Sequence, residues 1–255
     1  MTGETAFITG ATSGFGLATA RLFASKGWDL VITSRRKKEL EAVAKEIEGQ
    51  HKVHATPLVF DVRDRSAIKK LQAKRPEAFD VDVLVNNAGL ALGTETLQDG
   101  NPEEWDVVID TNVKGLLYMT RAVLPNMLKR GRGHIVNIGS TAGHWTYKGG
   151  AVYCASKHAV KAIHESLRLD IHGSGVRVSS IDAGLVETNF SVVRFRGDKE
   201  KAKKVYEGLT PLSPDDIAET IWWTVSRPPH VNIHEIILMP TDQASVRDVH
   251  RRAAN

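Results

Sequence analysis

The stretch TAFITGATSGFG, residues 5–16, decides the fold class of this 255-residue chain. Its first five residues are apolar or β-branched and predict a strand, and a segment with helical periodicity follows the glycines. Glycines at positions 10, 14 and 16 permit a tight turn and let backbone N–H groups approach a pyrophosphate at a helix N-terminus. Alone, such a turn is also compatible with a plain strand-to-helix connection. Its position after the first strand of a β–α–β unit favours the nucleotide-binding interpretation.

Short apolar runs and longer helix-like segments alternate along the rest of the chain. Several apolar runs are almost continuous, which is typical of strands covered on both faces. The alternation predicts an α/β fold with one doubly wound parallel sheet of about seven strands and helices on both faces. No linker or repeat interrupts it, so we expect a single domain over residues 1–255. The predicted strands are residues 5–9, 28–33, 54–60, 81–85, 134–139, 176–181 and 234–239.

Two segments depart from this regular alternation. A long helix is predicted from Pro102 to Arg130, with a kink or an early end at Pro125. Residues Thr188 to Pro214 are irregular and contain the charged run RFRGDKEKAKK. A mobile lid over a site and a plain surface helix are both compatible with such a run.

The composition is ordinary for a soluble globular protein, with 42% hydrophobic and 25% charged residues. The formal charge is +4, and the 34 basic and 30 acidic residues are interspersed, which argues against nucleic-acid binding. The single cysteine, Cys154, excludes an internal disulfide and suits a reducing compartment. The chain shows neither a signal peptide nor an apolar run of roughly 18 residues, so we expect a cytoplasmic protein without a membrane span.

The end of the second predicted strand, VITSRRKK, distinguishes between nicotinamide cofactors. An NAD site usually has Asp or Glu there to hold the ribose hydroxyls. This chain instead has Ser34, followed by Arg35 and Arg36. A guanidinium can bind a phosphate through two hydrogen bonds, and the sequence places no carboxylate beside it. We therefore expect NADP(H), with Arg35 as the main phosphate ligand. The alternative is the solvated basic start of a helix.

Two further predicted strands end in short polar motifs. FDV places Asp61 and Val62 after the third strand, and VNNAG places Asn87, Ala88 and Gly89 after the fourth. Ligands of open parallel sheets bind beyond the carboxyl ends of the strands. Each motif alone is compatible with a turn, but together they predict one ligand-binding edge.

Ser140, Tyr153 and Lys157 are the candidates for catalysis. Ser140 ends the fifth strand at the same edge, and Lys157 follows Tyr153 by one helical turn. The pKa of a free phenol, near 10, is too high for proton exchange at neutral pH, but a nearby ammonium stabilises phenolate and lowers that pKa. The Ser140 hydroxyl is suited to bond the substrate oxygen. The alternative is an ordinary surface helix, which the neighbouring motifs disfavour.

Together, TGATSGFG, NNAG, Asn112 in DTNVKG, Ser140 and YCASK (153–157) resemble the short-chain dehydrogenase/reductase family, in the same order and at similar intervals, over nearly the whole chain. The resemblance implies a Rossmann-like fold, an NADP-dependent oxidoreductase acting on CH–OH groups, and a homotetramer or homodimer, of which we expect the tetramer. Tyr153 would be the acid–base, and Lys157 would lower its pKa and hold the nicotinamide ribose. Ser140 would orient the substrate, and Asn112 would hold a water of the proton relay. The implied cofactor-binding residues are Gly10, Thr12, Ser13, Gly14, Phe15, Gly16, Ser34, Arg35, Arg36, Asp61, Val62, Asn87, Ala88, Gly89, Tyr153, Lys157, Gly184, Val186 and Thr188.

One position departs from the family pattern. Ala183–Gly184 follows the sixth strand, where family members usually have Pro-Gly. We therefore expect a less rigid loop at the place where Val186 and Thr188 would contact the nicotinamide.

NNAGLALG, GSTAGHWTYKGGAVY, GLVETNFSVVRFRGD and MPTDQ resemble more narrowly the NADP-dependent 3-hydroxy acid dehydrogenases of this family. These enzymes act on serine, allo-threonine, 3-hydroxypropionate or malonic semialdehyde, and close relatives reduce sulfoacetaldehyde. Such anionic substrates need a cation near Tyr153. In the predicted substrate loop, about residues 185–213, Arg194 is the candidate, with Tyr147 as a hydroxyl donor. A salt bridge is the alternative role for Arg194, and we expect Asp198 to pair with Arg196.

The prediction is therefore reversible hydride transfer between NADP(H) and a short-chain 3-hydroxy acid or similar anionic alcohol. Ser140, Tyr147, Tyr153 and Arg194 would surround the substrate, and we expect no bound metal. A sulfoacetaldehyde reductase and a reductase of neutral carbonyls are alternatives within the family. A non-catalytic NADP-binding sensor is the alternative of another class.

Overall fold

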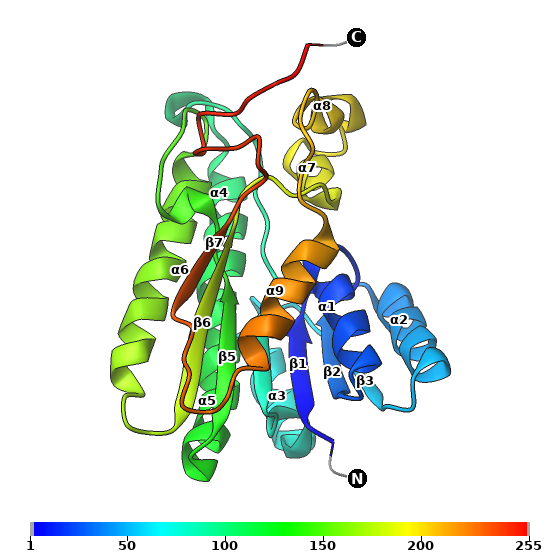
Figure 1. The fold of residues 1–255 in the computed structure, drawn as a ribbon. Coiled ribbons are helices and arrows are strands. Elements are labelled where there is room, and N and C mark those ends of the chain that lie inside the picture. The colour runs from blue at the N-terminus through cyan, green and yellow to red at the C-terminus, as the bar shows by residue number, and fades with distance from the viewer. Residues whose placement is uncertain (1–2, 254–255) are drawn as a thin grey trace.

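Alternating buried strands and helices build one parallel sheet in the computed structural model, which describes residues 3–253 (Figure 1). Residues 1 and 255, the bounds of the predicted domain, lie outside that range. The strand order is β3-β2-β1-β4-β5-β6-β7, and every neighbouring pair is parallel. The strands are β1 (Thr5–Thr9), β2 (Asp29–Ser34), β3 (Ala55–Val59), β4 (Val83–Asn86), β5 (Gly133–Ile138), β6 (Val176–Ala183) and β7 (Glu235–Leu238).

All seven predicted strands are present, and their ends differ from the predicted bounds by at most two residues. The largest extension is in β6, which continues past Ile181 to Ala183 because Ala183 is in register with Leu238 of β7. The extension places Asp182 within the sheet, close to the carboxyl edge.

Helices cover both faces of the sheet, as predicted (Figure 1). Alternating strand residues serve the two faces: Ile8 packs against α1, α2 and α9, whereas Phe7 packs against α3, α5 and α6. Each face is a closed apolar cluster, and burial of this kind is the main source of the fold's stability. The helices are α1 (Gly14–Ser25), α2 (Lys37–Gln50), α3 (Arg65–Lys74), α4 (Pro102–Ile109), α5 (Leu116–Arg130), α6 (Ala151–Asp170), α7 (Asn189–Arg194), α8 (Lys199–Lys204) and α9 (Pro214–Val225).

The long predicted helix is divided into α4, a π-helical segment at Asp110–Gly115, and α5. The early end expected at Pro125 is wrong, because α5 continues to Arg130. The buried side chain of Met127 anchors the last turn, and Gly131 ends the helix in the left-handed conformation with φ 66°. The π-helical segment shifts the helical register at Asn112 and is a common feature of functional sites.

The irregular segment Thr188–Pro214 contains two short helices, α7 and α8, which lie above the carboxyl edge of the sheet (Figure 1). The segment therefore overlies the predicted ligand-binding edge, which is the position expected of a lid. Within the described range, none of the helices combines the length and apolarity that crossing a membrane requires.

Candidate active site

A cleft of about 400 Å³ opens at the carboxyl edge of the sheet. It brings together predicted residues from seven separate stretches of the sequence, and of the nineteen predicted cofactor-binding residues it leaves out only Gly16. The predicted residues that line it are Gly10, Thr12, Ser13, Gly14, Phe15, Ser34, Arg35, Arg36, Asp61, Val62, Asn87, Ala88, Gly89, Ser140, Tyr153, Lys157, Gly184, Val186 and Thr188.

The glycine turn forms one end of this cleft. Gly10 and Gly14 have φ of 70° and 54°, values that favour glycine, and a Cβ on Gly16 would lie 2.5 Å from the Gly10 carbonyl oxygen. The Thr9 hydroxyl accepts hydrogen bonds of 2.9 Å from the N–H groups of Asn87 and Ala88, which ties the turn to the end of β4. Gly16 thus has a packing role beneath the turn. Because the glycines of this turn carry no side chains, a dinucleotide pyrophosphate can approach its backbone closely.

The two arginines after β2 occupy different environments. Arg36 Nη2 donates to the hydroxyls of Thr12 and Ser13 at 2.7 and 3.2 Å, so its guanidinium lies against the glycine turn. Arg35 Nη1 lies 3.8 Å from a carboxylate oxygen of Asp61. The expectation that no carboxylate stands beside Arg35 is therefore wrong, although Arg63 already holds Asp61 at 2.7 Å. The pair of guanidinium groups still fits a phosphate ester, with Arg36 the more favourably placed.

The three candidate catalytic residues converge on the other end of the cleft. Tyr153 and Lys157 come from the N-terminal part of α6, and Ser140 directly follows β5. Lys157 Nζ donates to the Ile138 carbonyl oxygen at 2.8 Å and lies 5.9 Å from the centre of the Tyr153 ring. The Ser140 hydroxyl donates to the Ala183 carbonyl oxygen at 3.3 Å and accepts from the Ala142 N–H at 3.1 Å.

Burial dominates the acid–base properties of this triad. Desolvation raises the pKa of the Tyr153 phenol above its ordinary value, and the Ser140 hydroxyl and the Arg194 charge oppose that shift only in part. The net shift of the Tyr153 pKa is thus upward, opposite to the net lowering that was expected. Burial also lowers the pKa of Lys157 itself, to about 8, against an opposing effect of Asp182. At neutral pH the arrangement holds a protonated phenol beside an ammonium group.

Asn112 makes structural hydrogen bonds, which are compatible with the role that the family resemblance implies for it. Its Oδ1 accepts from the Leu90 N–H at 2.9 Å, and its Nδ2 donates to the Leu90 carbonyl oxygen at 2.8 Å and the Ser156 hydroxyl at 3.0 Å. The side chain is buried and joins the π-helical segment both to the loop after β4 and to α6.

The structure places Arg194 over Tyr153, as the anion-site hypothesis requires. The guanidinium carbon of Arg194 lies 5.9 Å from the centre of the Tyr153 ring and 5.4 Å from that of Tyr147. Its Nη1 donates to the Tyr147 hydroxyl at 3.0 Å, and its Nε donates to the Gly93 carbonyl oxygen at 3.2 Å. These contacts hold the cation without pairing it to a carboxylate.

Arg196 has different partners from the one expected. It binds Glu104 through two hydrogen bonds of 2.6 and 2.7 Å and Glu95 through one of 2.8 Å. Asp198 instead caps the N-terminus of α8 by accepting from the Lys201 N–H at 3.0 Å. The predicted pairing between Arg196 and Asp198 is therefore wrong: Arg196 binds α4 and the loop after β4, whereas Asp198 caps α8.

Some residues of the cleft have no signal in the sequence. Phe190 packs edge-on against Tyr153 with ring centres 5.6 Å apart, and Val193 and Leu90 also line the cleft. They are apolar residues in loops and short helices, and nothing in their spacing distinguishes them from core residues.

The loop after β6 is well held despite Ala183. The Gly184 N–H donates to the Leu238 carbonyl oxygen at 2.8 Å, and the Leu185 N–H donates to Gln243 Oε1 at 2.8 Å. Gln243 is buried, so the C-terminal segment supplies a support that the sequence did not indicate.

Comparison with known proteins agrees with the family resemblance seen in the sequence motifs. Residues 4–199 match the family described as short chain dehydrogenase. The chain belongs to the short-chain dehydrogenase family. It is 51% identical over 239 residues to the NADP-dependent 3-hydroxy acid dehydrogenase YdfG of Salmonella typhi, which covers 93% of this chain and 95% of that protein. It is 47% identical over 239 residues to sulfoacetaldehyde reductase 2 of Chromohalobacter salexigens, covering 93% and 94%.

Among solved structures, this short-chain dehydrogenase is similar to the closed form of a serine dehydrogenase complexed with NADP+. The TM-score is 0.90 at 46% identity, over 97% of this chain and 100% of that one. The Rossmann-like fold predicted from the motifs is confirmed.

Proposed function

We propose that the protein interconverts a short-chain 3-hydroxy acid, or a similar anionic alcohol, with its semialdehyde or keto form, using NADP(H). The observation that carries the proposal is the Arg194 guanidinium, which lies 5.9 Å from the ring centre of Tyr153. A cation at that position is suited to bind a carboxylate or sulfonate only a few atoms from the reacting carbon.

The cofactor assignment is supported by the glycine turn and by the two guanidinium groups after β2. The turn between β1 and α1 would hold the pyrophosphate, and Arg36 with Arg35 would hold the 2′-phosphate. Tyr153, Lys157, Val186 and Thr188 would border the nicotinamide. When bound, the nicotinamide supplies or accepts the hydride.

The residues of the chain would handle the proton. In the reduction, the Tyr153 hydroxyl gives its proton to the substrate oxygen, and in the oxidation the phenolate takes it back. The raised pKa of the half-buried Tyr153 phenol favours its protonated form, which suits the reductive direction. The Ser140 hydroxyl would bond the same substrate oxygen, and the Lys157 ammonium would stabilise phenolate as it forms. Asn112 would support the relay by fixing the π-helical segment against α6.

The anion would bind against the Arg194 guanidinium, with the Tyr147 hydroxyl beside it. Because the Tyr147 hydroxyl and the Gly93 carbonyl fix the guanidinium, little side-chain freedom remains to be lost on binding. Phe190 and Val193 add an apolar wall that limits the size of the substrate. We infer that a semialdehyde with its carboxylate two or three atoms from the carbonyl fits best. Sulfoacetaldehyde, whose sulfonate lies at a similar distance, is the second candidate.

The test is an NADPH-oxidation screen with malonic semialdehyde, sulfoacetaldehyde, succinic semialdehyde and a neutral ketone, with serine in the reverse direction. We expect the highest kcat/KM for malonic semialdehyde. Tyr153→Phe should abolish turnover and leave NADPH binding, followed by fluorescence, nearly intact. Turnover in this variant at the wild-type rate would refute the acid–base role.

The variant Arg194→Met distinguishes the recognition of the substrate anion from the catalytic step. We expect its kcat/KM for the anionic aldehydes to fall about 10- to 100-fold, which corresponds to the loss of a charge-assisted hydrogen bond. The neutral ketone serves as the internal control and should lose little. An equal loss on both substrates would mean that Arg194 does not recognise the anion. A kcat/KM for the neutral ketone that exceeds those for the anionic aldehydes and survives the substitution would favour a reductase of neutral carbonyls. NADPH binding without turnover of any carbonyl would favour a sensor.

Three further features remain predictions that accompany this function: a single domain, a homotetramer and a cytoplasmic location. Analytical ultracentrifugation checks the second, with a mass about four times that of the 28.0 kDa chain expected.

A further inference from the structure

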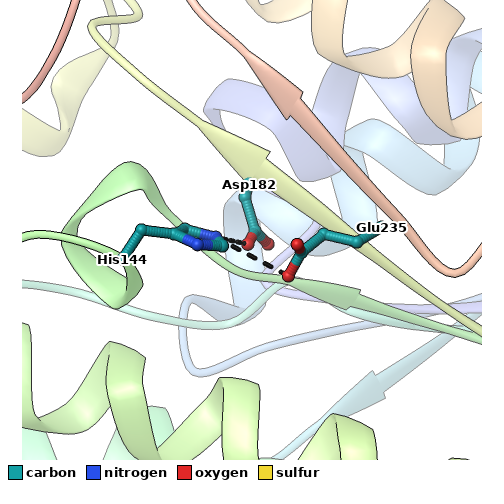
Figure 2. A group of neighbouring side chains, drawn as sticks. All are labelled: His144, Asp182 and Glu235. Carbon is teal, nitrogen blue, oxygen red and sulfur yellow. Dashed lines mark hydrogen bonds and ion pairs between the residues drawn. The ribbon is translucent and has the colours of Figure 1, made fainter.

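A second cluster of charged side chains lies next to the catalytic centre and takes no part in the function proposed above. Figure 2 shows His144, after β5, converging on Asp182 of β6 and Glu235 of β7. His144 Nε2 lies 2.5 Å from Asp182 Oδ2 and 3.6 Å from Glu235 Oε1. Lys161 of α6 completes the cluster, with its Nζ 3.1 Å from His144 Nδ1 and 3.4 Å from Glu235 Oε1.

The donor and the acceptor of each hydrogen bond in this cluster can be assigned in one consistent way. A lysine ammonium only donates, so His144 Nδ1 is the acceptor and the imidazole proton is on Nε2. That proton is then donated to Asp182. The Ser180 hydroxyl donates to the other oxygen of Asp182. The chain therefore runs from Lys161, which is partly exposed, through His144 to a carboxylate with only 2% of its surface exposed.

This direction argues against a metal site, although the ligand atoms of His144, Asp182 and Glu235 all lie within 4.8 Å of one another. A metal on His144 Nε2 would move the imidazole proton to Nδ1, which faces the ammonium of Lys161. Two donors would then face each other. The arrangement instead fits a buried carboxylate that is kept charged by donors.

Asp182 lies beside the backbone that holds Lys157. Lys157 Nζ donates to the Ile138 carbonyl oxygen at 2.8 Å. The next residue, Gly139, packs so closely on Asp182 that any Cβ there would overlap the carboxylate. Lys157 and Lys161 are one turn apart on α6 and therefore lie on the same face of this helix.

Burial and the charge of Asp182 shift the pKa of Lys157 in opposite directions. Burial lowers the pKa of Lys157 to about 8, and the negative charge of Asp182 raises it. Burial raises the pKa of Asp182, while the donors Ser180 and His144 oppose this and the charge of Glu235 reinforces it. On its own helix Lys157 faces the ring of Tyr153. His144 and Ser180 therefore favour the charged form of the Asp182 carboxylate, which in turn favours the ammonium form of Lys157.

We propose that Asp182, which accepts hydrogen bonds from His144 and Ser180, is a positioning residue that keeps Lys157 in its ammonium form. The inference depends on the catalytic part that the proposed function gives Lys157. It adds to that function a counter-ion for the lysine, with its own link to solvent through Lys161.

The test is the pH dependence of Asp182→Asn, which keeps the size of the side chain and removes its charge. We expect the alkaline limb of the kcat/KM profile, measured between pH 6 and 10, to move about one pH unit lower, the order of shift typical for a nearby opposite charge. The substrate is whichever carbonyl the wild-type enzyme reduces best in the screen. Glu165→Gln, an exposed carboxylate on the same helix, is the matched control and should not move the limb.

A second readout does not depend on turnover. The rate at which Lys157 reacts with an amine reagent, followed on its peptide by mass spectrometry, should rise at lower pH in Asp182→Asn than in the wild-type protein. If the proposed substrates are not turned over at all, this labelling still tests the counter-ion.

His144→Phe covers the case in which Asp182→Asn does not fold. It removes the donor to Asp182 and should shift both readouts in the same direction by a smaller amount. Folded variants that bind NADPH and retain the wild-type alkaline limb and labelling rate would overturn the proposal.

Discussion

Arg35 and Arg36 are neighbours in sequence with different partners in the fold. Arg36 is held by two hydroxyls of the glycine turn, whereas Arg35 points toward Asp61. A 2′-phosphate that displaces hydroxyl partners loses less than one that competes with a carboxylate. We therefore expect Arg36, rather than Arg35, to carry the preference for NADPH.

We predict that Arg36→Gln weakens NADPH binding about 10- to 100-fold, the effect of losing charge-assisted hydrogen bonds, and leaves NADH binding unchanged. Arg35→Gln should weaken NADPH binding less. Dissociation constants from protein fluorescence quenching measure both. A larger loss in the Arg35 variant would show that the 2′-phosphate binds on the side of Asp61.

At the scale of elements, Arg196 fastens the segment that carries Arg194. Within residues 3–253 it is the one non-glycine residue in the left-handed region, with φ 54°. Its guanidinium joins the end of α7 to Glu104 of α4 and to Glu95 in the loop after β4. The ion pair lowers the pKa of Glu95 to about 2. A strained backbone position that holds three hydrogen bonds indicates a clamp on the substrate loop.

We predict that Arg196→Gln raises KM for the anionic substrate roughly fivefold, within the range of exposed ion pairs, with kcat and NADPH affinity nearly unchanged. Glutamine is no easier than arginine to place at positive φ, so the backbone effect cancels. Added salt should raise the wild-type KM more than that of the variant. Lys199→Gln, exposed on the neighbouring α8, is the control. An equal change of KM in that control would contradict the clamp.

At the scale of the whole molecule, two buried histidines make stability depend on pH. His134 and His164 are almost fully buried, and desolvation lowers their pKa values to about 3 and about 4. In the unfolded chain they would take up protons near pH 6.5, which the folded protein does not do. The stability they contribute is therefore complete above pH 6.5 and is lost as pH falls below it.

We predict that each of these histidines lowers the free energy of unfolding by about 2 kcal/mol between pH 7.5 and pH 5. Urea denaturation at the two pH values measures the loss. The comparison with His134→Asn is the decisive one, because it isolates this histidine from every other group that titrates over the same interval. That variant should lose about 2 kcal/mol less than the wild-type protein over this interval. The same loss in both would mean that His134 is protonated in the fold.

Much of this molecule was predictable from short-range pattern. The seven strands, the helices on both faces and the cleft follow from periodicity, glycine spacing and the polar ends of strands, each a property of a few consecutive residues. The Arg196 clamp and the Asp182 chain were not predictable. Arg196 and Glu104 are 92 residues apart, and His144 and Asp182 are 38 apart, so only the folded chain brings them together. The direction of the Tyr153 shift was missed for a related reason, since burial is a property of the whole fold.

The hydrogen bond from the Leu185 N–H to Gln243 has a consequence for biosynthesis. The glycine turn, both arginines and the catalytic residues leave the ribosome well before residue 235, but the loop after β6 gains its two supports only from β7 and Gln243. A nascent chain can therefore carry all of the predicted nucleotide-binding motifs and still lack β7 and the Gln243 amide. These two elements hold one wall of the cleft. Assembly of this wall of the cleft therefore waits for the synthesis of residues 235–243.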